Sequence, residues 1–253
     1  MSGGTRRLFR GETTINFYGR RNVGFIASGL LVLITIISLF AQGLNLGIDF
    51  KGGVAFEVPV QGSISIDVVE DVLKSEGVLD DGVKIQTLKS ETESRIRIQL
   101  GDQEPQKVTA IQTALAEKAN LTVNDVSVST VSSTWGRNIT MKAVNALLVF
   151  FLVVSIFISF RFEWRMAASA ISAMAHDVAI SVGLYSVLGL EVTPATVVAF
   201  LTILGFSLYD TIVVFDKVHD NTSRFSGSKV SYGDVVNVSM NQVLMRSLNT
   251  SLA

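Results

Sequence analysis

The chain has 253 residues, of which 48% are hydrophobic and only 17% are charged, and its formal net charge is −1. The apolar residues are gathered into blocks, a composition typical of a polytopic membrane protein with one soluble insert. Without cysteine, without metal-binding spacing of its two histidines and without a basic, aromatic-rich stripe, the chain is expected to carry no disulfide, metal or cofactor and to bind no nucleic acid.

The first predicted elements are a polar segment, 1–22, and an apolar block, 23–44. The polar segment contains arginines at positions 6, 7, 10, 20 and 21, and positive charge beside a first span places that end in the cytoplasm. A cleavable signal peptide is the alternative for the block. Because the block is long and no small-x-small cleavage site precedes Asn45, we interpret it as a retained transmembrane helix.

Residues 45–137 have the character of a soluble α+β domain. Apolar residues alternate at 54–60, 83–85, 96–100 and from 126, and they recur at helical spacing at 66–73 and 108–115. The resulting order is β-α-β-β-α-β, which is typical of a ferredoxin-like domain. By the orientation rule this inserted domain is expected to lie outside the cytoplasm.

Three further membrane spans are predicted at 138–160, 166–190 and 194–216. Arg161 and Arg165 separate the first two on the cytoplasmic side, and the connection after residue 190 is too short for anything but antiparallel neighbours. Residues 217–253 are expected to form a cytoplasmic loop and an amphipathic helix that leads into a fifth span beyond the sequence given. Valines and methionines form one stripe of this helix, and polar residues including Ser239, Gln242 and Arg246 form another.

Asp210 is the most informative residue, because it stands in the fourth span. It lies ~24 Å along the helix from Pro194, inside a hydrocarbon layer of ~30 Å. A charge at such depth costs roughly 2.5–3.5 kcal/mol at mid-helix, so the residue is interpreted as functional. The alternative is a carboxylate wetted by headgroup water. A carboxylate in a low dielectric can exchange a proton, and this predicts a proton pathway.

His176, Asp177 and Arg246 are the other polar candidates of the membrane region. The His176-Asp177 pair lies at mid-depth in the third span, where it either belongs to the proton pathway or hydrogen-bonds neighbouring helices. Arg246 either faces the bundle or extends to a cytoplasmic interface as an anchor. Gly205 and Ser207 would let another helix approach Asp210 closely.

The segment GIDFKGG, residues 47–53, follows the first span. Its paired glycines permit positive φ and a tight passage from helix to strand. A phosphate-binding loop is not indicated, because no helix begins after the glycines. We interpret the segment as a joint that couples the inserted domain to the first span.

Together these motifs resemble the SecF proteins of the SecD/SecF family, which belongs to the resistance-nodulation-division superfamily. The resemblance is carried by GIDFKGG, the HD pair, LTILGFSLYDTIVVFDK at 201–217 and MRSLNTSL at 245–252. It implies that Asp210 and Arg246 form the proton pathway, with Asp177 and His176 as further members. It also implies that Asp49, Phe50, Gly52 and Gly53 form a structural coupling motif. Tyr209 stands where the family often has asparagine.

The resemblance implies a multi-pass protein of the cytoplasmic membrane that is not an enzyme. Such a protein is an auxiliary subunit of the Sec preprotein translocase and works with SecD, the SecYEG channel and SecA. It is thought to use the proton motive force to swing its outer domain, which grips the emerging preprotein. The lipid bilayer would surround its membrane-spanning helices.

Two alternatives remain open at this point. A small-molecule or lipid exporter of the same superfamily would carry larger outer modules than the ~85 residues found here. An intramembrane aspartyl protease needs two carboxylates sharing a proton, and Asp177 is the only candidate partner for Asp210. The context AHDVA around Asp177 lacks the glycine-flanked setting expected of that protease family.

Overall fold

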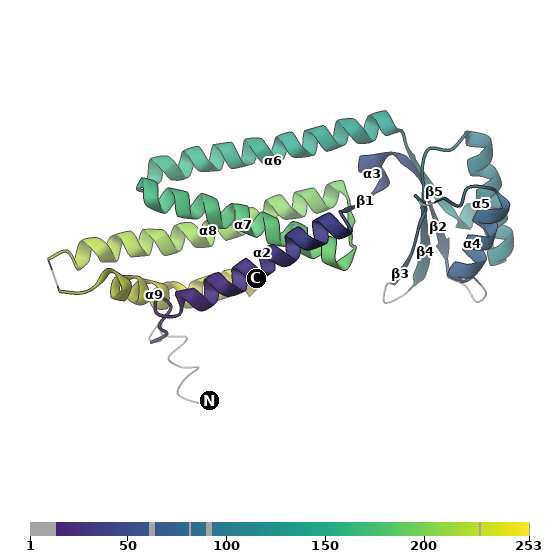
Figure 1. Ribbon diagram of the computed structural model, residues 1–253. Coiled ribbons are helices and arrows are strands. Elements are labelled where there is room, and N and C mark those ends of the chain that lie inside the picture. The colour runs from purple at the N-terminus through teal and green to yellow at the C-terminus, as the bar shows by residue number, and fades with distance from the viewer. Residues whose placement is uncertain (1–13, 61–63, 81, 90–92, 228, 253) are drawn as a thin grey trace. The chain divides into compact units, whose positions relative to one another are not determined.

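The computed structural model describes residues 14–60, 64–80, 82–89, 93–227 and 229–252 (Figure 1). The described chain divides into two compact units. The helical unit comprises residues up to 45 with 147–190 and 195 onward, and the α+β unit comprises 46–146 with 191–194. The arginines at positions 6, 7 and 10, on which the predicted orientation partly depends, lie outside the described residues.

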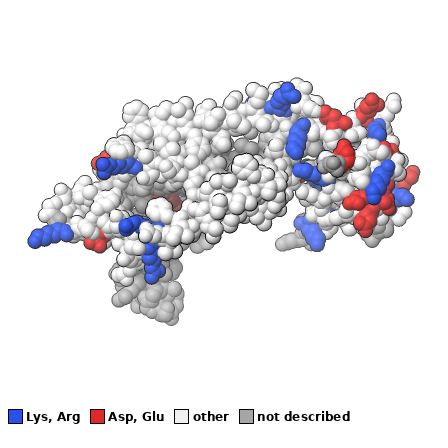
Figure 2. All heavy atoms as spheres, in the orientation of Figure 1, with Lys and Arg blue, Asp and Glu red and all other residues white. Residues whose placement is uncertain are grey.

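Four helices in the described part of the chain are long and apolar enough to cross a membrane. They are α2 (Arg21–Ala41), α6 (Ser133–Arg161), α7 (Trp164–Leu188) and α8 (Pro194–Arg224). Large apolar side chains project outward from them, as Phe40 and Phe160 do with exposures of 90% and 89%. In Figure 2 the charged side chains of the helical unit gather toward one end, and its visible middle is almost free of them. An apolar surface of this kind is suited to contact with lipid. The prediction of a helical membrane protein is therefore confirmed.

Two of these helices are longer than the spans predicted from the sequence. The helix α6 begins at Ser133, before the predicted limit of 138, and α8 continues to Arg224, beyond the predicted limit of 216. Hydropathy marks only the apolar part of a helix, whereas backbone hydrogen bonding continues into the polar residues that follow.

Close packing of α2 against α7 organises the helical unit (Figure 1). The hydroxyls of Ser38 and Ser186 are 2.8 Å apart, and Ser186 also donates to the carbonyl of Gly43. A second set of contacts joins α6, α7 and α8 through buried Ile158, Met174 and Leu204. At the contact of α2 with α7, the small, hydroxyl-bearing Ser38 and Ser186 allow the two backbones to approach closely. Such packing matters in a membrane, where the hydrophobic effect does not drive helices together.

The last helix of the helical unit is α9 (Tyr232–Leu252). It binds the N-terminal segment, because the side chain of Asn241 accepts from the Ile15 amide at 3.0 Å and donates to the Ile15 carbonyl at 2.9 Å. Its most buried residues include Val235, Ser239 and Asn241. The buried face is therefore partly polar and partly apolar.

The α+β unit is built on a four-stranded antiparallel sheet in the order β3-β4-β2-β5. Its elements in chain order are β2 (Gly53–Pro59), α4 (Ile66–Ser75), β3 (Lys84–Lys89), β4 (Ser94–Leu100), α5 (Pro105–Ala119), a 3₁₀ turn (Val123–Asp125) and β5 (Ser127–Val131). The helices α4 and α5 cover one face (Figure 1). Between helices and sheet lies a core that contains Phe56, Leu73, Ile98 and Leu115.

Local sequence explains where the helices of this unit begin and end. The Ser65 hydroxyl accepts from the Val68 amide at the start of α4, at 3.4 Å. Pro105 occupies the first turn of α5, where its missing N–H costs nothing, and Asn120 ends that helix in the left-handed conformation.

Besides the 3₁₀ turn, three short elements were not predicted from the sequence. The strands β1 (Asn45–Leu46) and β6 (Glu191–Val192) pair with each other, and the Gly47 amide donates to the Val192 carbonyl at 3.0 Å. The helix α3 (Ile48–Lys51) is a single turn inside the GIDFKGG segment. Elements of two to four residues leave no periodic pattern to recognise.

Candidate functional site in the helical unit

Asp210 is half-buried on α8 and lines a hollow of about 760 Å³. Ser207 and Thr211 line the same hollow, and Thr250 reaches it from α9. Ser207, at position i−3, is near Asp210 on the helix surface because of the 3.6-residue period, and Thr211 directly follows Asp210 in the chain. The carboxylate therefore stands among hydroxyl groups at one side of an otherwise mainly apolar space.

A hydrogen-bonded chain of side chains joins α2, α7 and α8 beside this hollow. The Ser28 hydroxyl lies 2.7 Å from His176 Nε2, and His176 Nδ1 lies 3.3 Å from Asp177 Oδ1. Ser207 donates to Asp177 Oδ2. Ser207 thus contacts Asp177 and also lines the hollow of Asp210, so the two predicted acidic positions share a neighbour.

Arg246 contacts the residue next to Asp210 along the chain. Its guanidinium donates to the Tyr209 hydroxyl and lies 5.4 Å from the centre of the Tyr209 ring. Hydrogen bonding and cation–π attraction act together in this arrangement. The structure therefore brings the end of α9 to the Tyr209–Asp210 pair.

A second polar contact between α8 and α9 was missed by sequence reasoning. The Asn221 amide donates to the Ser239 hydroxyl at 2.9 Å and to the Gln242 side chain at 3.0 Å. Asn221 and Ser239 have exposures of only 2% and 0%. Because Ser239, Gln242 and Arg246 all contact α8, the polar stripe of α9 faces the bundle.

The other predicted motif lies in the α+β unit. Asp49 is in the first turn of α3, Phe50 is buried, and Gly52 and Gly53 have φ angles of +81° and +123°. A Cβ on Gly53 would overlap the carbonyl oxygen of Leu100. Positive φ and close backbone approach both require glycine here. These residues shape the start of β2, whereas Asp210, Arg246, His176 and Asp177 belong to the helical unit.

No group of three His, Asp or Glu side chains that could hold a metal ion occurs among the residues that the structure describes. The polar groups described around Asp177 and Asp210 are carboxylates, hydroxyls, the imidazole of His176 and the guanidinium of Arg246. Carboxylates, hydroxyls and imidazoles can pass protons, whereas the guanidinium remains positively charged.

Comparison with known families identifies the chain. Residues 110–253 match the family described as "Protein export membrane protein SecD/SecF, C-terminal", and residues 37–64 match the "SecD/SecF GG Motif". The chain belongs to the SecD/SecF family. This family membership confirms the resemblance based on the GIDFKGG, HD, SLYD and RSLNTS sequences.

Several members of the SecD/SecF family align with nearly the whole chain. The protein translocase subunit SecF of Mycobacterium tuberculosis (strain H37Rv) is 41% identical, and the alignment covers 97% of this chain and 57% of that protein. SecF of Mycobacterium leprae is 38% identical over 98% of this chain and 56% of its own. SecF of Calditerrivibrio nitroreducens is 32% identical over 97% and 81%. The chain thus spans little more than half the length of the mycobacterial proteins.

A solved structure agrees with this assignment. The crystal structure of SecDF, a translocon-associated membrane protein from Thermus thermophilus, has a TM-score of 0.84 and 31% identity to this chain. The match covers 98% of this chain and 35% of the SecDF chain. The present chain is therefore a multi-pass membrane protein of the SecD/SecF family, in which Asp210 and the GIDFKGG segment both lie within matched regions.

Proposed function

We propose that this chain is an auxiliary subunit of the Sec preprotein translocase that uses the proton motive force, together with SecD, to complete protein export. The observation that carries the proposal is that the two acidic positions of the helical unit, Asp177 and Asp210, share Ser207 as a neighbour. Ser207 donates to Asp177 and lines the same hollow as Asp210. A carboxylate in a membrane helix costs free energy, so such a residue is usually functional. Proton exchange is the function that its surroundings support.

In this proposal Asp210 takes up and releases the proton. Arg246, which contacts Tyr209, supplies the positive charge that attracts the ionised carboxylate in one state of the cycle. Asp177 and His176 form a second station of the pathway. One charge crossing the membrane potential releases ~2.3 kcal/mol per 100 mV, so a few protons suffice for a domain movement.

The inserted domain is assigned as a ferredoxin-like, extracytoplasmic module. The antiparallel order β3-β4-β2-β5 with both helices on one face supports the fold assignment. Arg20 and Arg21 before α2, with Arg161 and Arg165 at the connection between α6 and α7, support a cytoplasmic N-terminus in the cytoplasmic membrane. The module would grip a preprotein that leaves SecYEG after SecA has pushed it. The GIDFKGG segment would couple this module to α2.

The decisive experiment replaces Asp210 with Asn in sealed vesicles that contain the chain with SecD and SecYEG. Late preprotein export is measured with and without an imposed proton gradient. Asn preserves shape and most hydrogen bonding but binds no proton at the side chain. We expect Asp210→Asn to abolish the gradient-dependent part of export and to leave the gradient-independent part unchanged.

Asp216→Asn provides the matched control on the same helix. Asp216 pairs with Arg161 at 2.8 Å in an exposed position, so its replacement should change export little. Full gradient-dependent export by the Asp210→Asn variant would refute the proton-carrying role.

A further inference from the structure

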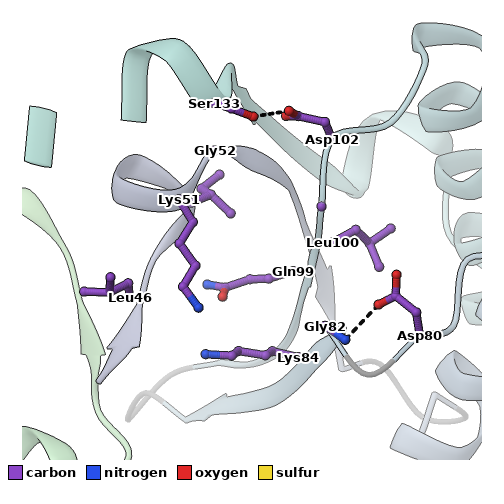
Figure 3. A pocket seen from close by; sticks show the side chains of 12 residues that line it. Leu46, Lys51, Gly52, Asp80, Gly82, Lys84, Gln99, Leu100, Asp102 and Ser133 are labelled. Atoms are coloured by element: carbon purple, nitrogen blue, oxygen red, sulfur yellow. Dashed lines mark hydrogen bonds between the residues drawn. The ribbon is translucent and has the colours of Figure 1, made fainter. Parts of the chain in front are cut away.

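The face of the sheet opposite α4 and α5 carries a polar hollow of about 340 Å³ (Figure 3). Lys84 on β3, Gln99 on β4 and Ala55 on β2 are directly paired across the strands. Their side chains share this face, because neighbours in register point the same way and alternate with the core residues. The short helix α3 borders the hollow and adds Lys51.

Three nitrogen-bearing side chains extend into this hollow from different elements. Figure 3 shows Lys51, Gln99 and Lys84 reaching toward the same space. Two ammonium groups and one amide offer only donors at their nitrogen ends. The arrangement thus has the donor set of an anion site.

Gln99 gives an independent sign that a ligand belongs here. The residue is only 7% exposed, and its Nε2 is buried without a hydrogen-bond partner among the described residues. A buried donor that is left unpaired retains its full desolvation penalty. A ligand oxygen in the hollow would remove that penalty.

Charged groups of both signs surround the hollow. The pKa of Lys84 is lowered by burial and next by the charge of Lys51, and Glu191 opposes this shift. Glu191 already pairs with Arg97 at 3.1 Å. The lining carboxylates also have partners, since Asp80 accepts from the Gly82 amide and Asp102 from the Ser133 hydroxyl. The two ammonium groups therefore repel each other across a space that the carboxylates of Asp80 and Asp102 also line.

We infer that this hollow binds a phosphate-type oxyanion, held by Lys51, Lys84 and Gln99. Lysine is a common phosphate ligand because it acts as a compact point charge, and the amide can donate to a further oxygen. Inorganic phosphate and the phosphate of an anionic lipid headgroup present the same chemistry. The inference does not depend on proton coupling in the helical unit.

Calorimetric titration of the purified full chain in an uncharged maltoside detergent tests the site. One arm titrates sodium phosphate against chloride at constant ionic strength, and the other titrates short-chain phosphatidylglycerol below its micelle concentration. We expect saturable binding in at least one arm. Binding of phosphate alone assigns the free ion, and binding of the lipid assigns a headgroup. Absence of saturable binding in both arms would overturn the inference.

Substitutions locate the binding. Lys51→Met and Lys84→Met should each weaken it about tenfold or more, because each removes a charge-assisted hydrogen bond. Lys89→Met, at the exposed far end of β3, is the matched control and should leave affinity unchanged. Equal weakening by Lys89→Met would show nonspecific charge attraction and would overturn the site.

Gln99→Glu separates loss of binding from loss of folding. A carboxylate at this position supplies the anion internally, so the variant should melt at a higher temperature than the parent chain and should no longer bind phosphate. A Gln99→Glu chain that binds phosphate with unchanged affinity would contradict the proposed ligand set.

Discussion

Tyr209 presents both a hydroxyl and a ring face to Arg246, and these two contacts can be tested separately. Tyr209→Phe keeps the cation–π contact and removes the hydrogen bond, so it should reduce gradient-driven export only partly and shift its pH profile. Arg246→Met removes both contacts and the charge, so it should reproduce the Asp210→Asn defect. The measurement is the gradient-dependent rate of export between pH 6 and 8.

Arg224→Met is the control for this prediction, because Arg224 is an exposed cation at the end of α8, the helix that carries Tyr209 and Asp210. Its replacement should leave the rate and the pH profile unchanged. If Arg246→Met also exported normally, Arg246 would be only an interfacial anchor, as the alternative from the sequence holds.

At the level of residues, sequence identified the charged candidates but not their uncharged partners. Asp210, Asp177 and Arg246 are conspicuous because charge in a membrane helix is costly. Ser28 and Asn221 are not conspicuous, since hydroxyl and amide side chains are tolerated along such helices. Only the packing of α2 and α9 against their neighbours gives these two residues their contacts. The interpretation of His176-Asp177 as a link between helices agrees with their contacts and does not exclude a proton role.

At the level of elements, the contact of α2 with α7 depends on the absence of a side chain at Gly183. A Cβ there would overlap the hydroxyl of Thr35. We expect Gly183→Ala to destabilise the purified chain by about 1–3 kcal/mol, the usual cost of overpacking a closely packed contact. Equilibrium unfolding in mixed micelles with a denaturing detergent measures this cost.

Gly29→Ala on α2 makes the same chemical change where nothing lies within 4 Å of the added Cβ. It should leave the free energy of unfolding nearly unchanged or slightly increased, because alanine is the better helix former. Equal effects of the two substitutions would show that the α2–α7 contact can shift to accept a methyl group.

Periodicity predicts elements well where they are long and have one apolar face. The strands β2 and β4 and the helices α4 and α5 have this form, and so do the long helices at the level of hydropathy. The buried face of α9 could not be predicted in this way. Its orientation follows from Asn221 on the preceding helix α8 and from the N-terminal segment at Ile15, which lies far from α9 in sequence.

At the level of the whole molecule, the chain passes between its two units several times. The α+β unit includes residues 191–194, although these connect α7 with α8 of the helical unit. Within the α+β unit two contacts hold this connection. The Gly47 amide donates to the Val192 carbonyl, and Arg97 forms ion pairs with both Glu191 and Glu57. The helix that carries Asp210 is therefore covalently continuous with a segment that is anchored in the sheet.

In the proposed mechanism, this continuity predicts that a movement of α8 on proton uptake is passed to the inserted domain through the Arg97–Glu191 ion pair. The pair is 3.1 Å long and mostly buried, with side-chain exposures of 20% and 13%. Glu191→Gln keeps the shape but removes the charge, so gradient-dependent export should fall several-fold while the melting temperature changes little. Arg97→Gln breaks the same contact and also the Arg97–Glu57 pair, so the double variant should lose at least as much export as Glu191→Gln alone. Glu93→Gln, in an exposed pair with Arg95, should be silent. Normal export by the Glu191→Gln variant would show that force passes between the units by another route.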